Sequence, residues 1–333
     1  MTRRIIFVTG GAGFIGSNIA ARLAEDRSLD VVVCDRLREA ELGKWRNLAN
    51  HAIGDFVAPA DMFDWLEKRW RDVEAVVHMG AISSTTEPDA DRIIQTNFGL
   101  SRDLFRWCAD RQRRLIYASS AATYGDGTLG FEDRDDFESL AALRPLNAYG
   151  WSKALFDAFV ARQAAREYAP PQWAGLKFFN VYGPNEGHKG PMKSVAAQIW
   201  PAVREGQSVQ LFRSYCEGVP DGGQKRDFVY VRDVAEVVAW LVASPGVSGV
   251  YNLGSGRARS FEDLARAVFA AAGQEVRIDY IPMPAGIRDH YQYFTEARMD
   301  RLLAAGYSGG FTSLEAGIAD YVQRFLATDL PYR

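Results

Sequence analysis

The stretch RIIFVTGGAGFIG, residues 4 to 16, decides the fold of this chain. A short apolar run leads directly into glycines at positions 10, 11, 13 and 16, and helical periodicity follows. Glycines at this spacing permit a tight turn and the close approach of a pyrophosphate, and the helix that follows offers its N–H groups to phosphate. The stretch therefore predicts a strand, a turn and a helix that bind a dinucleotide. Ordinary turn glycines are the alternative interpretation.

Short β-branched runs alternate with longer amphipathic stretches through the first half of the chain. Helical periodicity begins near Phe14, extends over about residues 88 to 112, and returns from Asn147 to about Glu167. The alternation is typical of βαβ units and predicts a doubly wound parallel sheet, the Rossmann fold of the α/β class. The β-branched runs after the first are DVVVC at 30–34, EAVVH at 74–78, RRLIYAS at 113–119 and WAGLKFF at 173–179.

Two stretches rich in Gly, Pro and Asn, residues 180 to 194 and 217 to 225, interrupt this pattern. We expect both to be loops at a cleft. A length of 333 residues fits one large domain with a smaller one. The predicted Rossmann domain comprises 1–178, 228–255 and 292–309, and the predicted smaller α/β substrate-binding lobe comprises 179–227, 256–291 and 310–333.

Composition and charge argue against several classes of protein. The formal net charge is −3 and the chain has no basic stripe, so no nucleic-acid partner is expected. No apolar run reaches the roughly 18 residues needed to span a membrane, and MTRRIIFVTGG lacks the long apolar core of a signal peptide. A cytoplasmic protein without membrane contacts is expected. Cys34, Cys108 and Cys216 are widely separated, which argues against a disulfide framework or a zinc site.

Asp35 ends the second predicted strand, where an acidic residue holds a ribose hydroxyl of a dinucleotide. By itself it favours NAD, because its charge repels the additional phosphate of NADP. Arg36, Arg38 and Lys44 follow closely and can neutralise that phosphate. A solvated charged loop would contain the same residues. We expect NADP as the cofactor, with NAD as the alternative.

Tyr149 and Lys153, in NAYGWSK, are four residues apart and therefore share one face of a predicted helix. The lysine ammonium favours the phenolate and is expected to lower the pKa of Tyr149, so that the phenol exchanges a proton with a substrate alcohol. Ser120, in YASSAATYG, ends a predicted strand and can hydrogen-bond a developing ketone. A YxxxK pair alone is often only a surface pair, but after a glycine turn the three residues predict a dehydrogenase-type active site.

Several motifs together resemble a known family. TGGAGFIG, the serines before AATYG, YxxxK and NVYGP are similar to the extended short-chain dehydrogenases that epimerise, dehydrate or oxidise nucleotide sugars. From about residue 5 to residue 325 the chain resembles, more specifically, the ADP-L-glycero-D-manno-heptose 6-epimerase family. EGHKG and SSTTE are the most discriminating segments. The other segments that carry this likeness are YASSAATYG, FFNVYGPN, KRDFVYVRDVA, YNLGSGRARSF and HYQYFT.

The resemblance implies an isomerase. It would oxidise C-6 of the heptose to a ketone and reduce it again with the same bound NADP, in the synthesis of lipopolysaccharide core precursors. It would bind ADP-heptose or a similar nucleotide sugar and form a homo-oligomer, by family resemblance a pentamer.

The resemblance also assigns roles to individual residues, and no metal ion is among them. It implies that Ser120, Tyr149, Lys153 and, as a second base, Lys189 are catalytic. The implied cofactor contacts are Gly10, Gly13, Phe14, Ile15, Gly16, Asp35, Arg36, Lys44, Met79, Gly80, Ala81, Ile82, Ser83, Asn97, Tyr149, Lys153 and Val181. The implied substrate contacts are Ser83, Asn180, Lys189, Pro191, Gln198, Phe212, Arg213, Ser214, Tyr215, Arg226 and Tyr291.

Some positions depart from the family pattern. Arg36 stands where the family commonly has Asn, and Pro59 replaces a lysine. Pro191 and Gln198 replace a serine and a histidine, and the insertion at 217–223 is longer than expected. These departures concern how the cofactor and the sugar are recognised, not the type of reaction.

The residues by themselves leave alternatives open. Lys189, between glycines, is also compatible with a solvated loop. Arg226 can clamp a diphosphate or, with Asp227, anchor the FVYV strand. A 4-epimerase or dehydratase for another nucleotide sugar would use the same scaffold. A non-catalytic dinucleotide sensor is a further alternative, but it would have no need for the serine, tyrosine and lysine together.

Overall fold

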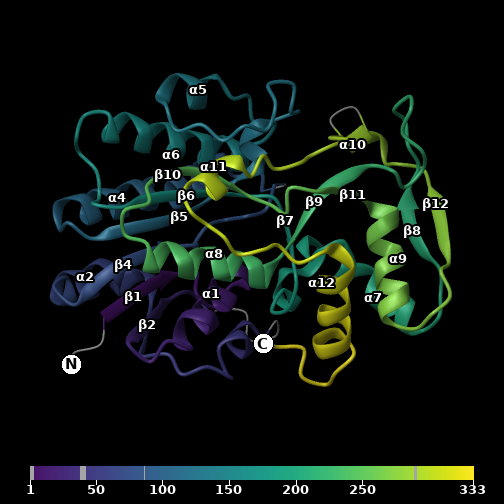
Figure 1. Ribbon diagram of the computed structural model, residues 1–333, viewed down its shortest axis with the longest axis horizontal. Helices are drawn as coiled ribbons and strands as arrows, with labels where there is room; N and C mark the ends of the chain where they lie inside the picture. The colour runs from purple at the N-terminus through teal and green to yellow at the C-terminus, as the bar shows by residue number, and fades with distance from the viewer. Residues whose placement is uncertain (1–3, 38–42, 86, 289–290) are drawn as a thin grey trace.

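The computed structural model describes residues 4–37, 43–85, 87–288 and 291–333. Its larger part is a seven-stranded sheet in which neighbouring strands are parallel. From β1 the chain proceeds outward to β2 and β3 and then crosses to β4, so the winding reverses between β1 and β4 (Figure 1). The predicted doubly wound Rossmann fold is confirmed. Across the sheet the strands are β10 (Gly249–Leu253), β6 (Trp173–Phe178), β5 (Arg114–Ser120), β4 (Val73–His78), β1 (Arg4–Thr9), β2 (Leu29–Cys34) and β3 (Asp55–Val57).

Both faces of this sheet are buried, which is why its strands are almost continuously apolar. Alternate residues of β1 point to opposite faces: Ile6 and Val8 pack with α1 and α8, whereas Ile5 and Phe7 pack with α2, α4 and α6. α5 lies beside α6, and α11 lies beside β10. These helices are α1 (Phe14–Ala24), α2 (Met62–Arg69), α4 (Leu100–Asp110), α5 (Phe137–Ala142), α6 (Ala148–Ala164), α8 (Val231–Ala243) and α11 (Asp300–Ala304).

The helix predicted over about residues 88 to 112 is interrupted. α3 (Ala90–Ile93) continues into a π turn at Ile94–Gly99, and α4 follows. The wider turn accompanies a fully buried Asn97, whose side chain bonds to neighbouring segments instead of solvent. An average period of 3.6 residues does not reveal such a local change. The helices predicted from Phe14 and from Asn147 are present as α1 and α6.

A second group of elements surrounds an apolar cluster of its own, and Figure 1 shows α7, α9 and the two-stranded sheet far from α2 and α4. Within the stretch predicted as a loop at 180–194, β7 is a strand because it pairs with β9. The division into two lobes at the predicted boundaries stays a prediction. This group comprises β7 (Asn180–Tyr182), β8 (Val209–Phe212), β9 (Lys225–Tyr230), β11 (Ala258–Ser260), β12 (Ile278–Ile281), α7 (Val195–Arg204), α9 (Phe261–Ala271), α10 (Ala285–Arg288) and α12 (Leu314–Tyr321).

Candidate active site

The carboxyl ends of β1, β2, β4, β5 and β6 surround a cavity of about 230 Å³. A second cavity of about 380 Å³ adjoins it, because the two share lining residues around Gly10, Asp35 and Gly80. Together they form an elongated site at the point where the winding of the sheet reverses, the expected place for a dinucleotide. The first cavity is lined by Gly10, Gly13, Phe14, Ile15, Gly16, Asp35, Lys44, Met79, Gly80, Ala81, Ser83, Ala118, Tyr149, Lys153, Phe178, His188 and Lys189.

The glycine turn brings the backbone of β1 close to the segment after β4. Gly10 has a φ of +64°, and a Cβ there would lie 2.6 Å from the backbone nitrogen of Gly80. α1 begins directly after Gly13, and no side chain caps it. Its first residues line the cavity, so uncapped N–H groups at a helix N-terminus are available to an anion. The pyrophosphate of a dinucleotide fits this cradle.

The carboxylate of Asp35 is compensated within the protein. Its Oδ2 accepts the N–H of Ala12 at 2.9 Å, and its Oδ1 accepts the Lys44 ammonium at 2.6 Å and the N–H of Arg36 at 2.6 Å. The side chains of Asp35 and Lys44 are only 9% and 22% exposed, so solvent screens the pair weakly. The charge that would repel a second phosphate on the ribose is therefore reduced.

Cations gather in the second cavity, away from Tyr149. Arg36, Lys44 and Arg92 all line it, and Pro59 lies in the same wall. Arg92 comes from α3, and its Nη1 lies 3.4 Å from Glu87 Oε2. Nothing in the local sequence distinguishes Arg92 from an ordinary surface arginine. Arg38 lies outside the described residues.

Ser120, Tyr149 and Lys153 are brought together at the end of β5. Ser120 is the last residue of that strand, and α6 begins at Ala148, so the tyrosine and the lysine lie in its first turns. Asn147 caps α6 by accepting the N–H of Gly150 at 2.8 Å. The Lys153 ammonium donates to the carbonyl of Ala118 at 2.8 Å.

Gly150 and Asn97 help to hold α6 against the segments that follow β5 and β4. A Cβ at Gly150 would lie 2.6 Å from the carbonyl oxygen of Ala122, so only glycine lets α6 approach the turn after Ser120 this closely. Asn97 accepts the N–H of Ile82 at 2.8 Å and donates to Ser152 Oγ at 3.1 Å. Asn97, predicted as a cofactor contact, thus ties the segment after β4 to α6.

The expectation that Lys153 lowers the pKa of Tyr149 is not met in the free site. Burial raises the pKa of Tyr149 above its ordinary value, and a hydrogen bond with Ser120 only partly opposes this. Burial also lowers the pKa of Lys153 to about 8, while Asp157 opposes that shift. The lysine is itself buried and bonded to a carbonyl, and desolvation is the largest cause of the shift for both groups.

A buried ion pair lies behind these residues. Lys177 Nζ is 2.9 Å from Asp157 Oδ2, and both side chains are at most 1% exposed. Asp157 also accepts the hydroxyl of Ser119 at 2.6 Å, and Lys177 donates to Thr123 Oγ1 at 2.7 Å. The pair joins β5, β6 and α6 on either side of Ser120. The sequence contains no local sign of it, because its partners are far apart along the chain.

Lys189 enters the cavity from a 3₁₀ turn at Gly187–Met192. Its ammonium lies 5.2 Å from the centre of the Phe14 ring and, within the described part of the chain, forms no hydrogen bond or ion pair. Burial lowers its pKa, and Glu186 opposes this. The neighbouring His188 lines both cavities, and burial lowers its pKa to about 4. A solvated loop lysine, the alternative interpretation, does not match this position.

Asp227 and Arg226 have separate environments. Asp227 is fully buried and accepts N–H groups of Ser255, Gly256 and Ala297, so it anchors β9 to two other segments. Arg226 forms no ion pair among the described residues.

Aromatic rings flank the guanidinium of Arg226. Its Cζ lies 5.2 Å from the centre of the Tyr291 ring and 5.6 Å from that of Phe261. Burial lowers the pKa of Arg226, which favours an anionic partner.

The remaining predicted substrate contacts line neither of the two cavities. Tyr215 is 48% exposed, and its ring lies 3.8 Å from the Arg288 guanidinium carbon. Gln198 is exposed and donates to the carbonyls of Lys193 and Pro191 at 2.6 and 3.2 Å. The others are Asn180 on β7, Phe212 at the end of β8, and Arg213 and Ser214 directly after it. Val181, predicted as a cofactor contact, packs half-buried between the two main apolar clusters.

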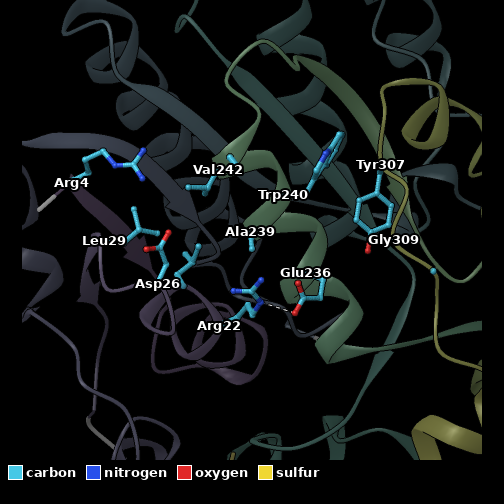
Figure 2. Close-up of a pocket in the computed structure, with 13 residues that line it drawn as sticks. Arg4, Arg22, Asp26, Leu29, Glu236, Ala239, Trp240, Val242, Tyr307 and Gly309 are labelled. Carbon is cyan, nitrogen blue, oxygen red and sulfur yellow. Dashed lines mark hydrogen bonds and ion pairs between the residues drawn. The ribbon is translucent and has the colours of Figure 1, made fainter.

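A larger cavity of about 460 Å³ lies at the opposite edge of the sheet (Figure 2). Arg4 and Leu29, which begin β1 and β2, line it. Arg22 from α1 and Glu236 from α8 form an ion pair there at 2.6 Å. Among the described residues, its lining includes none of the predicted site residues. The predicted catalytic residues lie at the carboxyl edge instead.

No group of three or more His, Cys, Asp or Glu side chains among the described residues is arranged to hold a metal ion. Within the same residues, no helix is both long and apolar enough to cross a membrane.

Known proteins resemble this chain over almost its whole length. The ADP-L-glycero-D-manno-heptose-6-epimerase of Nitratidesulfovibrio vulgaris is 48% identical over 328 residues, 98% of this chain and 99% of that protein. The crystal structure of the Helicobacter pylori ADP-L-glycero-D-manno-heptose-6-epimerase is 29% identical with a TM-score of 0.79, covering 97% of this chain and 96% of that one. The Thermus thermophilus UDP-glucose 4-epimerase, in complex with NAD, is 28% identical with a TM-score of 0.70, covering 96% and 97%.

The model of the NAD dependent epimerase/dehydratase family matches residues 6–254. This match covers the glycine turn, the end of β5, the first turns of α6 and the turn that carries Lys189. The chain therefore belongs to the NAD dependent epimerase/dehydratase family and, within it, to the family of the ADP-L-glycero-D-manno-heptose-6-epimerases.

Proposed function

We propose that this enzyme interconverts ADP-D-glycero- and ADP-L-glycero-D-manno-heptose, as a step toward lipopolysaccharide core precursors. The observation that carries the proposal is that Tyr149 and Lys189 line one cavity from different elements. The substrate named for the Nitratidesulfovibrio vulgaris and Helicobacter pylori relatives supports the choice of sugar. A nicotinamide cofactor held by the glycine turn and the second cavity would supply the redox chemistry, the transfer of a hydride from C-6 and back.

Inversion at C-6 explains why two proton-transferring groups are needed. Because hydride returns from the same direction, the intermediate ketone must present its other face, and its oxygen then occupies a different place. Proton transfer needs about 2.6 to 3.2 Å between heavy atoms, so one fixed phenol does not serve both places. Tyr149 takes the proton at one position, with Ser120 holding the oxygen and Lys153 beside it. Lys189 serves the other position.

Several finer points of the function stay proposals. The guanidinium of Arg226, flanked by Tyr291, suits the diphosphate of the sugar nucleotide because arginine pairs with phosphate in a bidentate manner. The segment from Phe212 to Tyr215 is proposed to contact the nucleotide sugar from the same side. A smaller lobe that closes on the substrate, a pentameric assembly and a cytoplasmic location are further predictions.

We predict that the protein binds NADP more tightly than NAD. Asp35 is already paired with Lys44, and Arg36 and Arg92 line the second cavity, whose described lining residues include no carboxylate besides Asp35. Arg36→Ala and Arg92→Ala should each weaken NADP binding roughly tenfold, about 1.4 kcal/mol, and leave NAD binding unchanged. Calorimetric titration with both cofactors measures this.

The matched control for these variants is Arg106→Ala, an exposed arginine of α4 that lines neither cavity. It should bind both cofactors as the parent protein does. Release of NAD alone from the denatured protein, with no increase in melting temperature on adding NADP, would contradict the assignment of Arg36. The fold and the epimerase proposal would be unaffected.

The hydride should return to the carbon that it left without exchange with water. Turnover of ADP-D-glycero-D-manno-heptose in deuterium oxide should therefore give an epimer without deuterium at C-6, as proton NMR and mass spectrometry would show. Deuterium at C-6 would indicate that a proton is abstracted from carbon, and the oxidation–reduction route would be wrong.

A further inference from the structure

Glu186 is a buried carboxyl group that the proposed reaction does not use. Its side chain is 1% exposed. Its Oε2 accepts the N–H of Ser194 at 2.5 Å, and its Oε1 accepts the hydroxyl of Ser194 at 2.5 Å and the phenol of Tyr321 at 2.9 Å. Burying a carboxyl group costs free energy unless the group is hydrogen-bonded, and these three hydrogen bonds offset that cost for Glu186.

The hydrogen bonds to Glu186 fit its charged form. An N–H group only donates, so Oε2 must accept from Ser194. Burial and the charge of Glu186 raise the pKa of Tyr321 well above its ordinary value, so that phenol keeps its proton and donates. Three donors facing two oxygens fit a carboxylate. A protonated acid would need the hydroxyl of Ser194 to turn and accept from it. Burial raises the pKa of Glu186, and the hydrogen bonds from Ser194 and Tyr321 and the charge of Lys189 oppose this shift.

The carboxylate closes a loop whose middle carries Lys189. Glu186 begins the loop and Ser194 ends it, since Ser194 also caps α7. The N–H of Lys189 donates to the carbonyl of Glu186 at 3.0 Å. Gly187 and Gly190 stand in open space on either side of Lys189, so no packing of their own holds the loop. The loop is held at its base, which Tyr321 attaches to α12, and at His188, whose ring lies 3.2 Å from the Asn47 amide.

We propose that Glu186 is a positioning residue for Lys189, which clamps the base of its loop and supplies the negative charge that balances the buried ammonium. The proposal rests on the proposed function in that Lys189 transfers a proton there. It accounts for two observations together: a lysine held in a cavity without an ion-pair partner among the described residues, and a fully bonded carboxylate three residues before it.

The direction of the electrostatic effect follows from the burial of Lys189. Burial lowers the pKa of Lys189, and the charge of Glu186 opposes this shift. Removing that charge should therefore lower the pKa further, so that the ammonium loses its proton at a lower pH. Among the described residues, the other titratable groups that line the cavity are His188 on the same loop, Asp35 and Lys44 after β2, and Tyr149 and Lys153 on α6.

The decisive measurement is the pKa of Lys189 itself, because it does not depend on turnover. The rate at which acetic anhydride acetylates Lys189, followed by peptide mass spectrometry at a series of pH values, reports this pKa in the full-length protein. Glu186→Gln keeps the shape of the side chain and removes its charge. It should lower the pKa of Lys189 by about one unit. Tyr321→Phe keeps the charge and should leave that pKa within a few tenths of the parent value.

Two comparisons separate the possible outcomes. An unchanged pKa of Lys189 in Glu186→Gln overturns the inference, whatever the role of Lys189. A lowered pKa together with full activity of Lys189→Met supports the inference about Glu186 and overturns the proton-transfer role of Lys189 instead.

A second variant tests the clamp if glutamine at 186 prevents folding. Ser194→Ala keeps the charge of Glu186 and removes the hydroxyl that closes the loop. It should lower kcat about tenfold, with NADP affinity within a factor of two of the parent. A kcat equal to that of the parent overturns the clamp. A loss of NADP affinity as large as the loss of kcat in Ser194→Ala also overturns the clamp. The substitution would then have disturbed the cofactor site as well as the position of Lys189.

Discussion

Replacing Tyr149 by phenylalanine is expected to lower the epimerisation rate by about 10²- to 10⁴-fold, the usual contribution of a positioned proton-transfer group. The ring stays and continues to fill its place in the cavity, so the fold and cofactor binding should be preserved. Only the oxygen that takes the proton from the C-6 alcohol is lost. Chromatographic measurement of ADP-heptose epimers over time gives the rate, and melting temperature and cofactor titration check the rest.

Tyr168→Phe is a matched control for this experiment. Its phenol bonds Asp110 at the surface and lines neither cavity, so its removal should leave the rate unchanged. Residual activity of Tyr149→Phe within tenfold of the parent, in a protein that still binds cofactor, would exclude Tyr149 as the proton-transfer group. The reaction would then depend on another acid/base in the cavity.

Replacing Lys189 by methionine is expected to lower epimerisation to a similar extent, because a substrate oxidised through Tyr149 could no longer be reduced to the other epimer. Methionine retains an unbranched apolar stem of similar length next to the Phe14 ring, which limits the disturbance of packing. A substrate labelled with deuterium at C-6 should keep its label in the recovered starting epimer and yield almost none of the product epimer.

Lys193→Met tests whether any lysine in this segment would give the same result. Lys193 follows the same turn, lines neither cavity and, among the described residues, forms no ion pair. Its replacement should leave the rate close to that of the parent. Full epimerase activity in Lys189→Met would refute the two-base scheme and leave Tyr149 as the sole acid/base.

The outline of the fold was predictable because it depends on local patterns. The spacing of the glycines after β1 predicts a tight turn within a few residues, and the apolar runs predict strands that are buried on both faces. The spacing of Tyr149 and Lys153 places them on one helix face for the same reason. β7 and the π turn around Asn97 were not predictable, since the first depends on pairing with β9 and the second on contacts with Ile82 and Ser152.

The protonation of the candidate site also depends on tertiary structure. A helix spacing of four residues predicts that a lysine and a tyrosine are close, but it contains nothing about how many protein atoms surround them. In the folded chain burial raises the pKa of Tyr149 and lowers that of Lys153 to about 8. Desolvation is a sum over the whole surroundings, and no short motif encodes it.

The sequence by itself determined the Rossmann architecture and the place of the glycine turn. It also indicated that Ser120, Tyr149 and Lys153 lie together. Only the tertiary structure decided how the rest of the site is supported. Asp227 proved to be an anchor, whereas Arg226 lies between two aromatic rings without an ion-pair partner among the described residues. Glu186 bonds Tyr321 across a separation of 135 residues. The physical reason is that hydrogen bonds and ion pairs in a buried site join groups from distant segments, and a one-dimensional pattern records only neighbours.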